Sequence, residues 1–208
     1  MRIESLKTTP DRAGRYWLRF EDGSSLALYR QTVEDFGLYT GLELSDGELA
    51  KLRDAAGAMS AKMRAVRIVS ASSVSKQELE KRLVQKGEDP EQAKNAVAWM
   101  VDLDLLDDKK TAEQIVLNCI RKGYGPARAK QALYEKRIPK DLWDDVLADY
   151  PDQSDQIVEF LHSKLTMDSD EKEVRRAIEA LMRRGHSYAS IRGGLKQLSL
   201  DWENFQED

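Results

Sequence analysis

One segment of this chain occurs twice in nearly the same form, and this repeat restricts the possible folds more than any other feature of the sequence. Residues 121–133, RKGYGPARAKQAL, align without a gap on residues 183–195, RRGHSYASIRGGL. In each copy an apolar-periodic segment ends in two basic residues and a glycine, the pattern of a helix closed by a left-handed residue. A small residue, Gly125 or Ser187, then stands where the next helix would begin. The repeat predicts an array of small helical units rather than a single enzyme core.

Composition places the chain among polar globular or repeat proteins, with 41% hydrophobic and 34% charged residues. No apolar run approaches the roughly 18–20 residues of a membrane-spanning helix, and no apolar signal region follows the first residues. One cysteine, Cys119, and two histidines allow neither an internal disulfide nor a cysteine-rich zinc site. We expect a cytoplasmic protein that needs no cofactor.

The net charge of −4 conceals blocks of opposite sign. Residues 121–140 hold seven bases and one acid, a net of +6. Residues 141–171 carry a net of −9, and residues 172–200 a net of +5. Such alternation is typical of a surface for a partner of mixed charge, although solvated helix faces give the same pattern.

The first 57 residues are expected to form a small antiparallel sheet and a short helix. Residues 15–20 alternate polar and bulky apolar side chains, and Asp22-Gly23 separates them from a similar run at 25–29, which is a strong hairpin signal. Residues 3–8 are the expected third strand, and the apolar residues of segment 33–42 are expected to cover the sheet. Ser45 and Glu48 have the spacing of a capping box at a helix start.

From about residue 58 the hydrophobic period changes from two to about 3.6, which predicts helices. We expect one three-helix repeat at 58–106 and a second at 107–150. Residues 151–208 are expected to hold a bridging helix, which carries Ile157, Leu161 and Leu165, and then the third three-helix repeat. In the first repeat, one helix carries Met63 to Val69, the next opens at Ser75, and the third at Pro90. The last repeat is expected to end in a short segment with Trp202 and Phe205. The predicted fold is mainly α with a small N-terminal sheet.

Motifs of catalysis and metal binding are missing from this sequence. It has no Walker loop and no dinucleotide fingerprint. Neither His162 nor His186 has a second histidine or cysteine at ligand spacing. Cys119 lies on an apolar stripe, which is typical of a small core residue, and the acidic cluster at 141–145 lacks the glycine turn of a calcium loop. We therefore predict that the protein is not an enzyme and binds no metal.

Several motifs, taken in order, resemble the RecX family, bacterial regulators of the recombinase RecA. The matching pieces are the LLDD junction at 105–108, the segment GYGPAR at 123–128, and RRGHSY at 183–188 followed by Ile191-Arg192. The segment from Ser75 to Gly87 fits the first repeat of the family, so the resemblance covers about residues 60 to 200. The chain departs from the family pattern at Asp104, where glycine is usual, at Thr111, where an aromatic residue is common, and at Ala129, where a larger aliphatic residue often packs.

The resemblance implies an elongated, curved array of three three-helix repeats without enzymatic activity. Members of the family bind the RecA filament on single-stranded DNA and inhibit its recombinase and ATPase activities in DNA repair and recombination. We expect the same partner here and a monomeric chain, with candidate contacts at Arg121, Lys122, Arg128, Lys130, Arg183, Arg184 and Arg192.

The alternative function is that of a stand-alone nucleic-acid-binding protein, because three-helix units resemble helix-turn-helix modules. The acidic net charge argues against it, since neutralising only a few phosphates gives weak and salt-sensitive binding. A weak direct contact with DNA stays open as an alternative.

Overall fold

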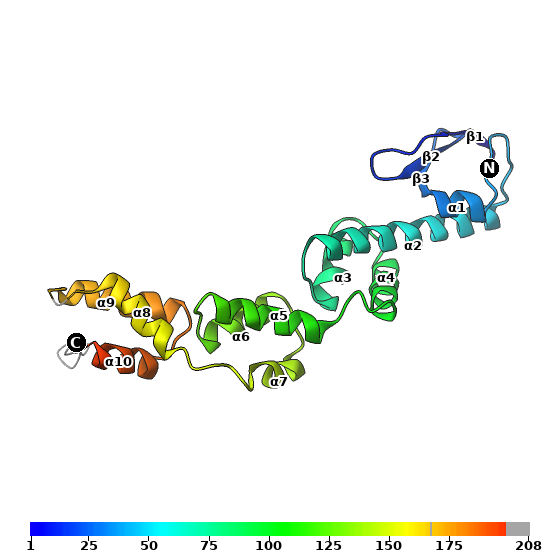
Figure 1. The fold of residues 1–208 in the computed structure, drawn as a ribbon. Coiled ribbons are helices and arrows are strands. Elements are labelled where there is room, and N and C mark those ends of the chain that lie inside the picture. Colours follow the sequence, from blue (N-terminus) through cyan, green and yellow to red (C-terminus); the bar gives the residue numbers. More distant parts are fainter. Residues whose placement is uncertain (167, 199–208) are drawn as a thin grey trace. The chain divides into compact units, whose positions relative to one another are not determined.

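The computed structural model describes residues 1–166 and 168–198, which contain ten α-helices and three strands. Figure 1 shows the order of these elements. The chain divides into two compact units, residues 1–107 and 108–208, and each is described by itself. Among the described residues no helix is both long and apolar enough to cross a membrane. The predicted fold class, mainly α with a small antiparallel sheet, is confirmed.

The first unit opens with an antiparallel sheet in the order β1 (Ile3–Leu6), β2 (Arg15–Phe20) and β3 (Ser25–Tyr29), as predicted. Gly23, in the turn between β2 and β3, has a φ of 83°. The short helix α1 (Arg30–Asp35) and the loop after it cover the sheet with the apolar residues expected in segment 33–42. Side chains of β1, β2 and β3 fill one core, including Ile3, Leu18, Phe20 and Leu28.

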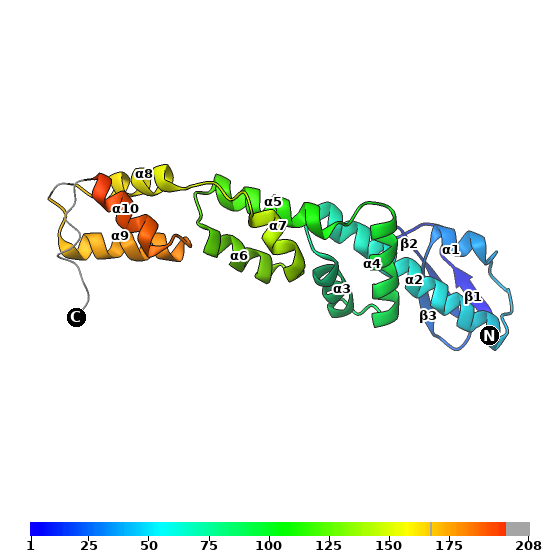
Figure 2. The ribbon, with the colours of Figure 1, turned by 90° about the horizontal axis from the view of Figure 1, so that it is seen from below.

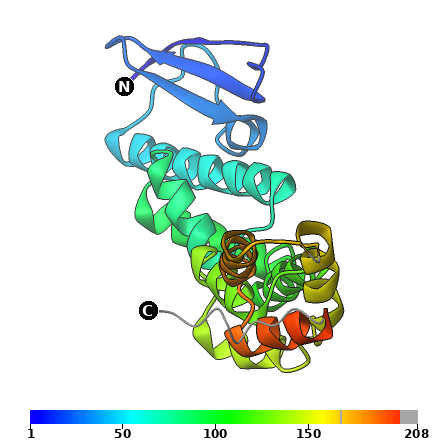
Figure 3. The ribbon, with the colours of Figure 1, turned by 90° about the vertical axis from the view of Figure 1, so that its left-hand side faces the viewer.

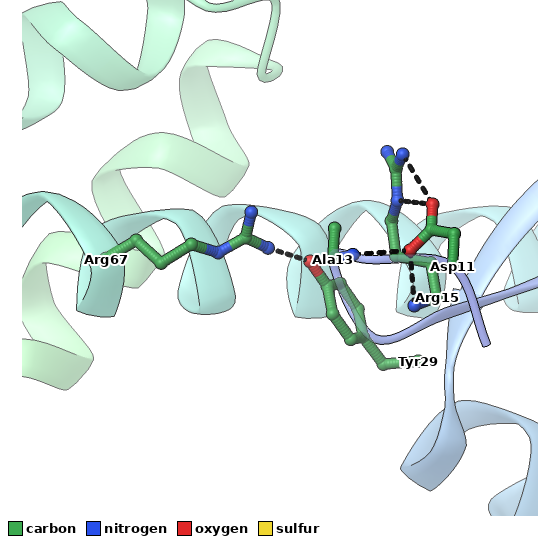
Figure 4. Close-up of polar contacts among 5 residues, drawn as sticks. All are labelled: Asp11, Ala13, Arg15, Tyr29 and Arg67. Atoms are coloured by element: carbon green, nitrogen blue, oxygen red, sulfur yellow. Dashed lines mark hydrogen bonds and ion pairs between the residues drawn. The ribbon is translucent and has the colours of Figure 1, made fainter.

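Two polar contacts hold the β1–β2 loop and the end of β3 (Figure 4). Asp11 accepts hydrogen bonds from the backbone N–H groups of Ala13 and Arg15, at 2.8 and 2.9 Å, and its carboxylate pairs with the Arg15 guanidinium at 2.8 Å. Hydrogen bonds from the backbone and side chain of Arg15 lower the pKa of Asp11 to about 2. Arg67 donates to the Tyr29 hydroxyl, which ties β3 to the long helix below the sheet.

That helix, α2 (Asp46–Ala71), is a single helix of 26 residues, so the prediction of a short helix followed by a separate one was wrong. Its start is as predicted, because Ser45 and Glu48 form a capping box. The sequence through the expected break is rich in alanine, a strong helix former, and Gly57 has no positive φ there. The boundary expected at residue 57 falls inside this helix.

The two halves of α2 contribute side chains to different cores. Figure 3 shows the sheet on one side of this helix and the following helices on the other. Leu49, Leu52 and Ala56 pack against the sheet. Ala61 and Ala65 are fully buried against α3 (Lys76–Gln85) and α4 (Pro90–Asp102). Their small side chains let α4 lie close along α2. Because its other half packs against the sheet, the sheet and the α3–α4 pair are both packed on this one helix.

The ends of α3 and α4 follow the predicted capping pattern. The Ser75 hydroxyl accepts a hydrogen bond from the Glu78 N–H at 3.1 Å, and Pro90 begins α4 directly after its cap, Asp89. Asp104 follows α4 with a φ of 56°. Asp104 is the position at which the family resemblance predicts glycine, and aspartate is among the few residues that adopt this backbone conformation readily.

The second unit contains two three-helix groups (Figure 2). The first comprises α5 (Asp108–Arg121), α6 (Pro126–Glu135) and α7 (Trp143–Leu147), with the 3-10 turn Lys140–Leu142 before α7. Its core includes Ala112, Val116, Leu133 and Ile138. The second comprises α8 (Ser154–Lys164), α9 (Glu171–Arg183) and α10 (Tyr188–Gln197).

The helix α8 has a different role from the bridge that the sequence predicted. Ile157, Leu161 and Leu165 are buried in one core with α9 and α10. A Cβ atom on Gly194 of α10 would lie 2.8 Å from the Ile157 Cγ2, so the two helices are in very close contact. The short end expected around Trp202 and Phe205 lies outside the described residues.

Candidate partner-binding site

The two copies of the repeated segment form equivalent helix ends. Gly123, after α5, has a φ of 62°, and Gly185, after α9, has a φ of 84°. This confirms the prediction that each glycine closes its helix in the left-handed region. The Ser187 hydroxyl caps α10 by accepting the Ser190 N–H at 3.1 Å, whereas Gly125 caps α6 without a side chain.

These two helix ends contact each other directly, which the sequence did not predict. The N–H of Gly125 donates to the Arg184 carbonyl oxygen at 2.9 Å, and the N–H of Ala127 donates to the Gly185 carbonyl oxygen at 3.3 Å. A Cβ atom on Gly125 would lie 2.1 Å from the Gly185 oxygen, and one on Gly185 would lie 2.2 Å from the Arg128 nitrogen. Both positions require glycine because backbone packs on backbone there.

A buried histidine and a half-buried tyrosine donate to backbone oxygens next to this contact. The Nε2 atom of His186 lies 3.0 Å from the Gly123 carbonyl oxygen, so this nitrogen carries the proton and donates. Burial lowers the pKa of His186, which the hydrogen bond to Gly123 opposes and the charge of Arg184 reinforces. The Tyr150 hydroxyl donates to the Tyr124 carbonyl oxygen at 2.6 Å, and burial raises its pKa to about 12. Both groups act as neutral donors to backbone oxygens, so His186 has a structural role.

Three of the predicted contact residues line one pocket beside this contact. Arg121, Lys122 and Arg184 border a pocket of about 330 Å³, termed here the basic pocket. Its remaining walls are Gly123, Gln156, Glu159, Phe160, Ser163 and Leu181.

The cations of the basic pocket are available to a ligand. The Arg184 guanidinium lies 4.6 Å from the centroid of the Phe160 ring, a cation–π contact. Arg121 donates to the Asn118 amide oxygen. Within residues 1–166 and 168–198, none of the three cations of this pocket has a carboxylate partner. Guanidinium and ammonium groups in such a setting bind carboxylates and phosphates through charge-assisted hydrogen bonds.

The other four predicted contact residues do not line the basic pocket. Arg183 pairs with Glu179 at 3.6 Å, and Arg128 pairs with Glu135 at 3.1 Å. Lys130 is exposed on α6, and Arg192 is partly buried on α10. Successive residues of a helix point about 100° apart, which explains why Arg183 and Arg184 have different surroundings.

The contribution of α8 to this pocket was not predicted. Gln156, Phe160 and Ser163 all line it and are spaced as residues of one helix face. A signal was available, because Ile157 and Leu161 mark the buried face of α8 and leave these three residues beside it. The expectation of a bridging helix at this place did not make use of this signal.

The structure also gives the surroundings of two other groups considered from the sequence. Cys119 is buried, and burial raises the pKa of its thiol, which favours the unreactive protonated form. In the part of the chain that the structure describes, no group of three or more His, Cys, Asp or Glu side chains is placed to hold a metal ion.

Comparison with known proteins points to one family. The family model described as "RecX, second three-helix domain" matches residues 107–147, which contain α5, α6 and α7. Proteins named "Regulatory protein RecX" are similar to this chain in sequence. One from Cronobacter sakazakii is 34% identical over 96 residues, 41% of this chain and 58% of that protein. One from Vibrio campbellii is 27% identical over 136 residues, 64% of this chain and 88% of that protein. Each of these similarities is to a RecX protein or to a RecX domain.

Solved structures of RecX proteins share its fold. One, described as a regulatory protein RecX, has a TM-score of 0.64 and 18% identity over 92% of this chain and 98% of that chain. RecX from Lactobacillus salivarius has a TM-score of 0.60 and 23% identity over 69% of this chain and 97% of that chain. The alignment spans only 58% of the Cronobacter sakazakii RecX. The RecX family model includes Arg121 and Lys122, whereas α8 and Arg184 lie outside its match.

Proposed function

We propose that this chain is a non-enzymatic regulator of the RecX family that binds the RecA filament on single-stranded DNA in the cytoplasm and inhibits its recombinase and ATPase activities. Its relatives are named regulatory proteins. The observation that carries the proposal is the basic pocket, in which Arg121, Lys122 and Arg184 come together although the last lies 62 residues beyond the second. A nucleoprotein filament presents carboxylates and phosphates, and both suit this pocket.

The distribution of charge supports a partner of mixed charge over a bare polyanion. The basic pocket borders α8, which belongs to the segment 141–171 with its net charge of −9. Opposite signs on neighbouring surfaces steer a partner into one orientation and exclude others. Naked DNA would meet repulsion from the acidic segment, whereas a protein filament can present bases to it.

The proposal is tested by reversing the charge of the pocket. The triple variant Arg121→Glu, Lys122→Glu and Arg184→Glu is compared with the double variant Arg175→Glu and Arg183→Glu. The control residues form ion pairs within α9, at 3.4 and 3.6 Å, and do not line the pocket. RecA hydrolyses ATP on single-stranded DNA in the presence of each protein. The triple variant should lose inhibition and the control should keep most of it.

Both kinds of negative outcome are informative. Full inhibition by a folded triple variant, judged by its helical circular dichroism, would exclude the basic pocket as the contact. No effect of the unmodified protein on RecA would reject the proposed function. Binding to a naked oligonucleotide, measured in parallel over a range of salt concentrations, separates the proposal from stand-alone nucleic-acid binding, which weakens steeply with salt.

A further inference from the structure

A second pocket lies between α8 and α9 and shares one wall with the basic pocket. It has a volume of about 210 Å³ and is lined by Phe160, Lys164, Glu173, Arg176, Ala177 and Ala180; it is termed here the α8–α9 groove. Phe160 borders both hollows. The groove and the basic pocket therefore form neighbouring parts of one surface within the second unit.

The basic residues of this surface divide into paired and unpaired ones. Arg175 pairs with Glu171 and Arg183 with Glu179, each within α9, and neither lines a hollow bordered by Phe160. Over the described ranges of the chain, Lys164 and Arg176 have no ion pair, and both line the groove. The groove's one acid, Glu173, already accepts the Asp170 N–H at 3.2 Å as part of the cap of α9.

Phe160, Ala177 and Ala180 supply the apolar part of the groove. The alanine side chains leave room between the two helices that larger residues would fill. Small-molecule sites usually enclose about 300–1,000 Å³, so a volume of about 210 Å³ suits one apolar side chain better than a whole cofactor. Unpaired cations border this apolar space at Lys164 and Arg176, and Arg184 lies on the other side of the shared wall.

We propose that the α8–α9 groove and the basic pocket together bind an acidic peptide segment of a protein partner. One apolar side chain of the peptide enters the groove between Phe160 and the two alanines. Flanking carboxylates bind Lys164, Arg176 and, across the shared wall, Arg184. This inference rests on the proposed function for the existence of a protein partner, and it names the chemistry by which that partner is recognised.

The same surface is poorly suited to a single-stranded nucleic acid. Binding of this kind uses aromatic faces on which bases stack, but the Phe160 ring already carries the Arg184 guanidinium at 4.6 Å. The groove is bordered by two helices, whose interior backbone groups are hydrogen-bonded within the helix and do not reach base edges. The acidic segment that includes α8 would also repel a continuous chain of phosphates.

A binding titration with the full chain tests this inference. The probe is a fluorescein-labelled peptide in which Asp and Glu residues flank a single Phe. Its binding is measured by fluorescence anisotropy. Arg176→Glu should weaken binding about tenfold, because it replaces a charge-assisted hydrogen bond with repulsion. Ala180→Met fills the groove with a good helix former and should weaken binding to a similar degree. Arg175→Glu, the matched neighbour, should leave the affinity unchanged, and a peptide with Ala in place of Phe should bind more weakly.

Each contrary outcome overturns the inference in a recognisable way. No binding of the peptide by the full chain, or equal losses in Arg175→Glu and Arg176→Glu, would reject the groove as its site. Tighter binding of oligo-dT than of the peptide, abolished by Arg176→Glu, would assign the surface to nucleic acid. Tighter peptide binding after removal of residues 199–208, which carry acids and aromatic residues, would assign it to the chain's own tail.

The RecA assay stays separate from this titration. Peptide binding without any effect on RecA would reject the proposed function and leave the groove standing. Unchanged inhibition of RecA by Ala180→Met, together with no peptide binding by the unmodified chain, would reject only the groove.

Discussion

At the scale of single residues, two glycines without side chains allow the two helix groups of the second unit to pack backbone against backbone. Gly125 and Gly185 lie where two helix ends exchange backbone hydrogen bonds, at distances that leave no space for a Cβ atom. Gly193, inside α10, has no neighbouring atom within 4 Å of a Cβ position. Replacement of glycine by alanine should therefore have opposite effects on stability at Gly185 and at Gly193.

Gly125→Ala and Gly185→Ala should each lower the free energy of unfolding by about 3 kcal/mol or more, because the backbone must separate to admit the methyl group. Gly185 adds strain from its φ of 84°. The matched variant Gly193→Ala should raise stability by about 1 kcal/mol, since alanine is the better helix former and has room. Urea unfolding measures all three. Equal stability of the unmodified chain and its Gly125→Ala variant would show that the two helix ends do not meet in solution.

His186 makes the stability of the second unit depend on pH. Burial lowers its pKa in the folded chain below the ordinary value of 6.5, so the unfolded chain takes up a proton first as the pH falls. The contribution of neutral His186 is complete above pH 6.5 and decreases below it, by at most about 1.4 kcal/mol per pH unit. Unfolding measured from pH 7.5 to 5 should show this loss, and His186→Gln should reduce the slope.

The exposed His162 on α8 provides the control for that measurement. His162→Gln is measured in parallel, and its slope of stability against pH is compared with that of His186→Gln. If both substitutions change the slope equally, the buried hydrogen bond to Gly123 is not the source of the pH dependence.

At the scale of elements, the continuity of α2 joins the sheet to the α3–α4 pair. Gly57→Pro should cost about 3 kcal/mol or more, because proline removes a hydrogen bond and clashes with the preceding turn. Gly57→Ala should stabilise by about 1 kcal/mol, since the nearest atom, Gln92 Cγ, would be 3.8 Å from the new Cβ. Urea unfolding of the isolated residues 1–107 reports both. Tolerance of proline at residue 57 would mean that two separate helices form there.

Local signals in the sequence predicted the ends of elements well. The Asp22-Gly23 turn, the capping box at Ser45 and the closing glycines at 123 and 185 depend on residues only a few positions apart, and the structure confirms them. The length of α2 was missed because its middle carries alanines and one glycine, which give a weak apolar period although they favour helix.

The candidate site was predictable only in part. Arg121, Lys122 and Arg184 were singled out as basic residues at helix ends, but their meeting depends on the contact between Gly125 and Gly185. That contact is made by backbone atoms and joins residues that are 60 positions apart in the sequence. Nor does a run of two arginines show which one pairs with a glutamate a turn away, as Arg183 does.

At the scale of the whole molecule, the division at residue 107 determines which fragments should fold. Residues 1–107 and 108–208, expressed separately, should each show a cooperative unfolding transition, because each contains its own cores. A fragment of residues 60–150 should unfold with little cooperativity, since it cuts α2 and removes the helix end that contacts Gly125. Circular dichroism during urea titration compares the three. A sharp transition for residues 60–150 would contradict this division.

The contact between Gly125 and Gly185 also imposes an order of events on the newly made chain. At the start of α6, the N–H groups of Gly125 and Ala127 donate to the carbonyl groups of residues 184 and 185, which are synthesised about 60 residues later. At roughly 5–20 residues per second, the ribosome needs about 3–12 s to add them. During that interval the N–H groups of Gly125 and Ala127 bond to water, as does the carbonyl oxygen of Gly123, which later accepts from His186. The first three-helix group therefore completes its hydrogen bonds at the start of α6 only after the second group has been synthesised.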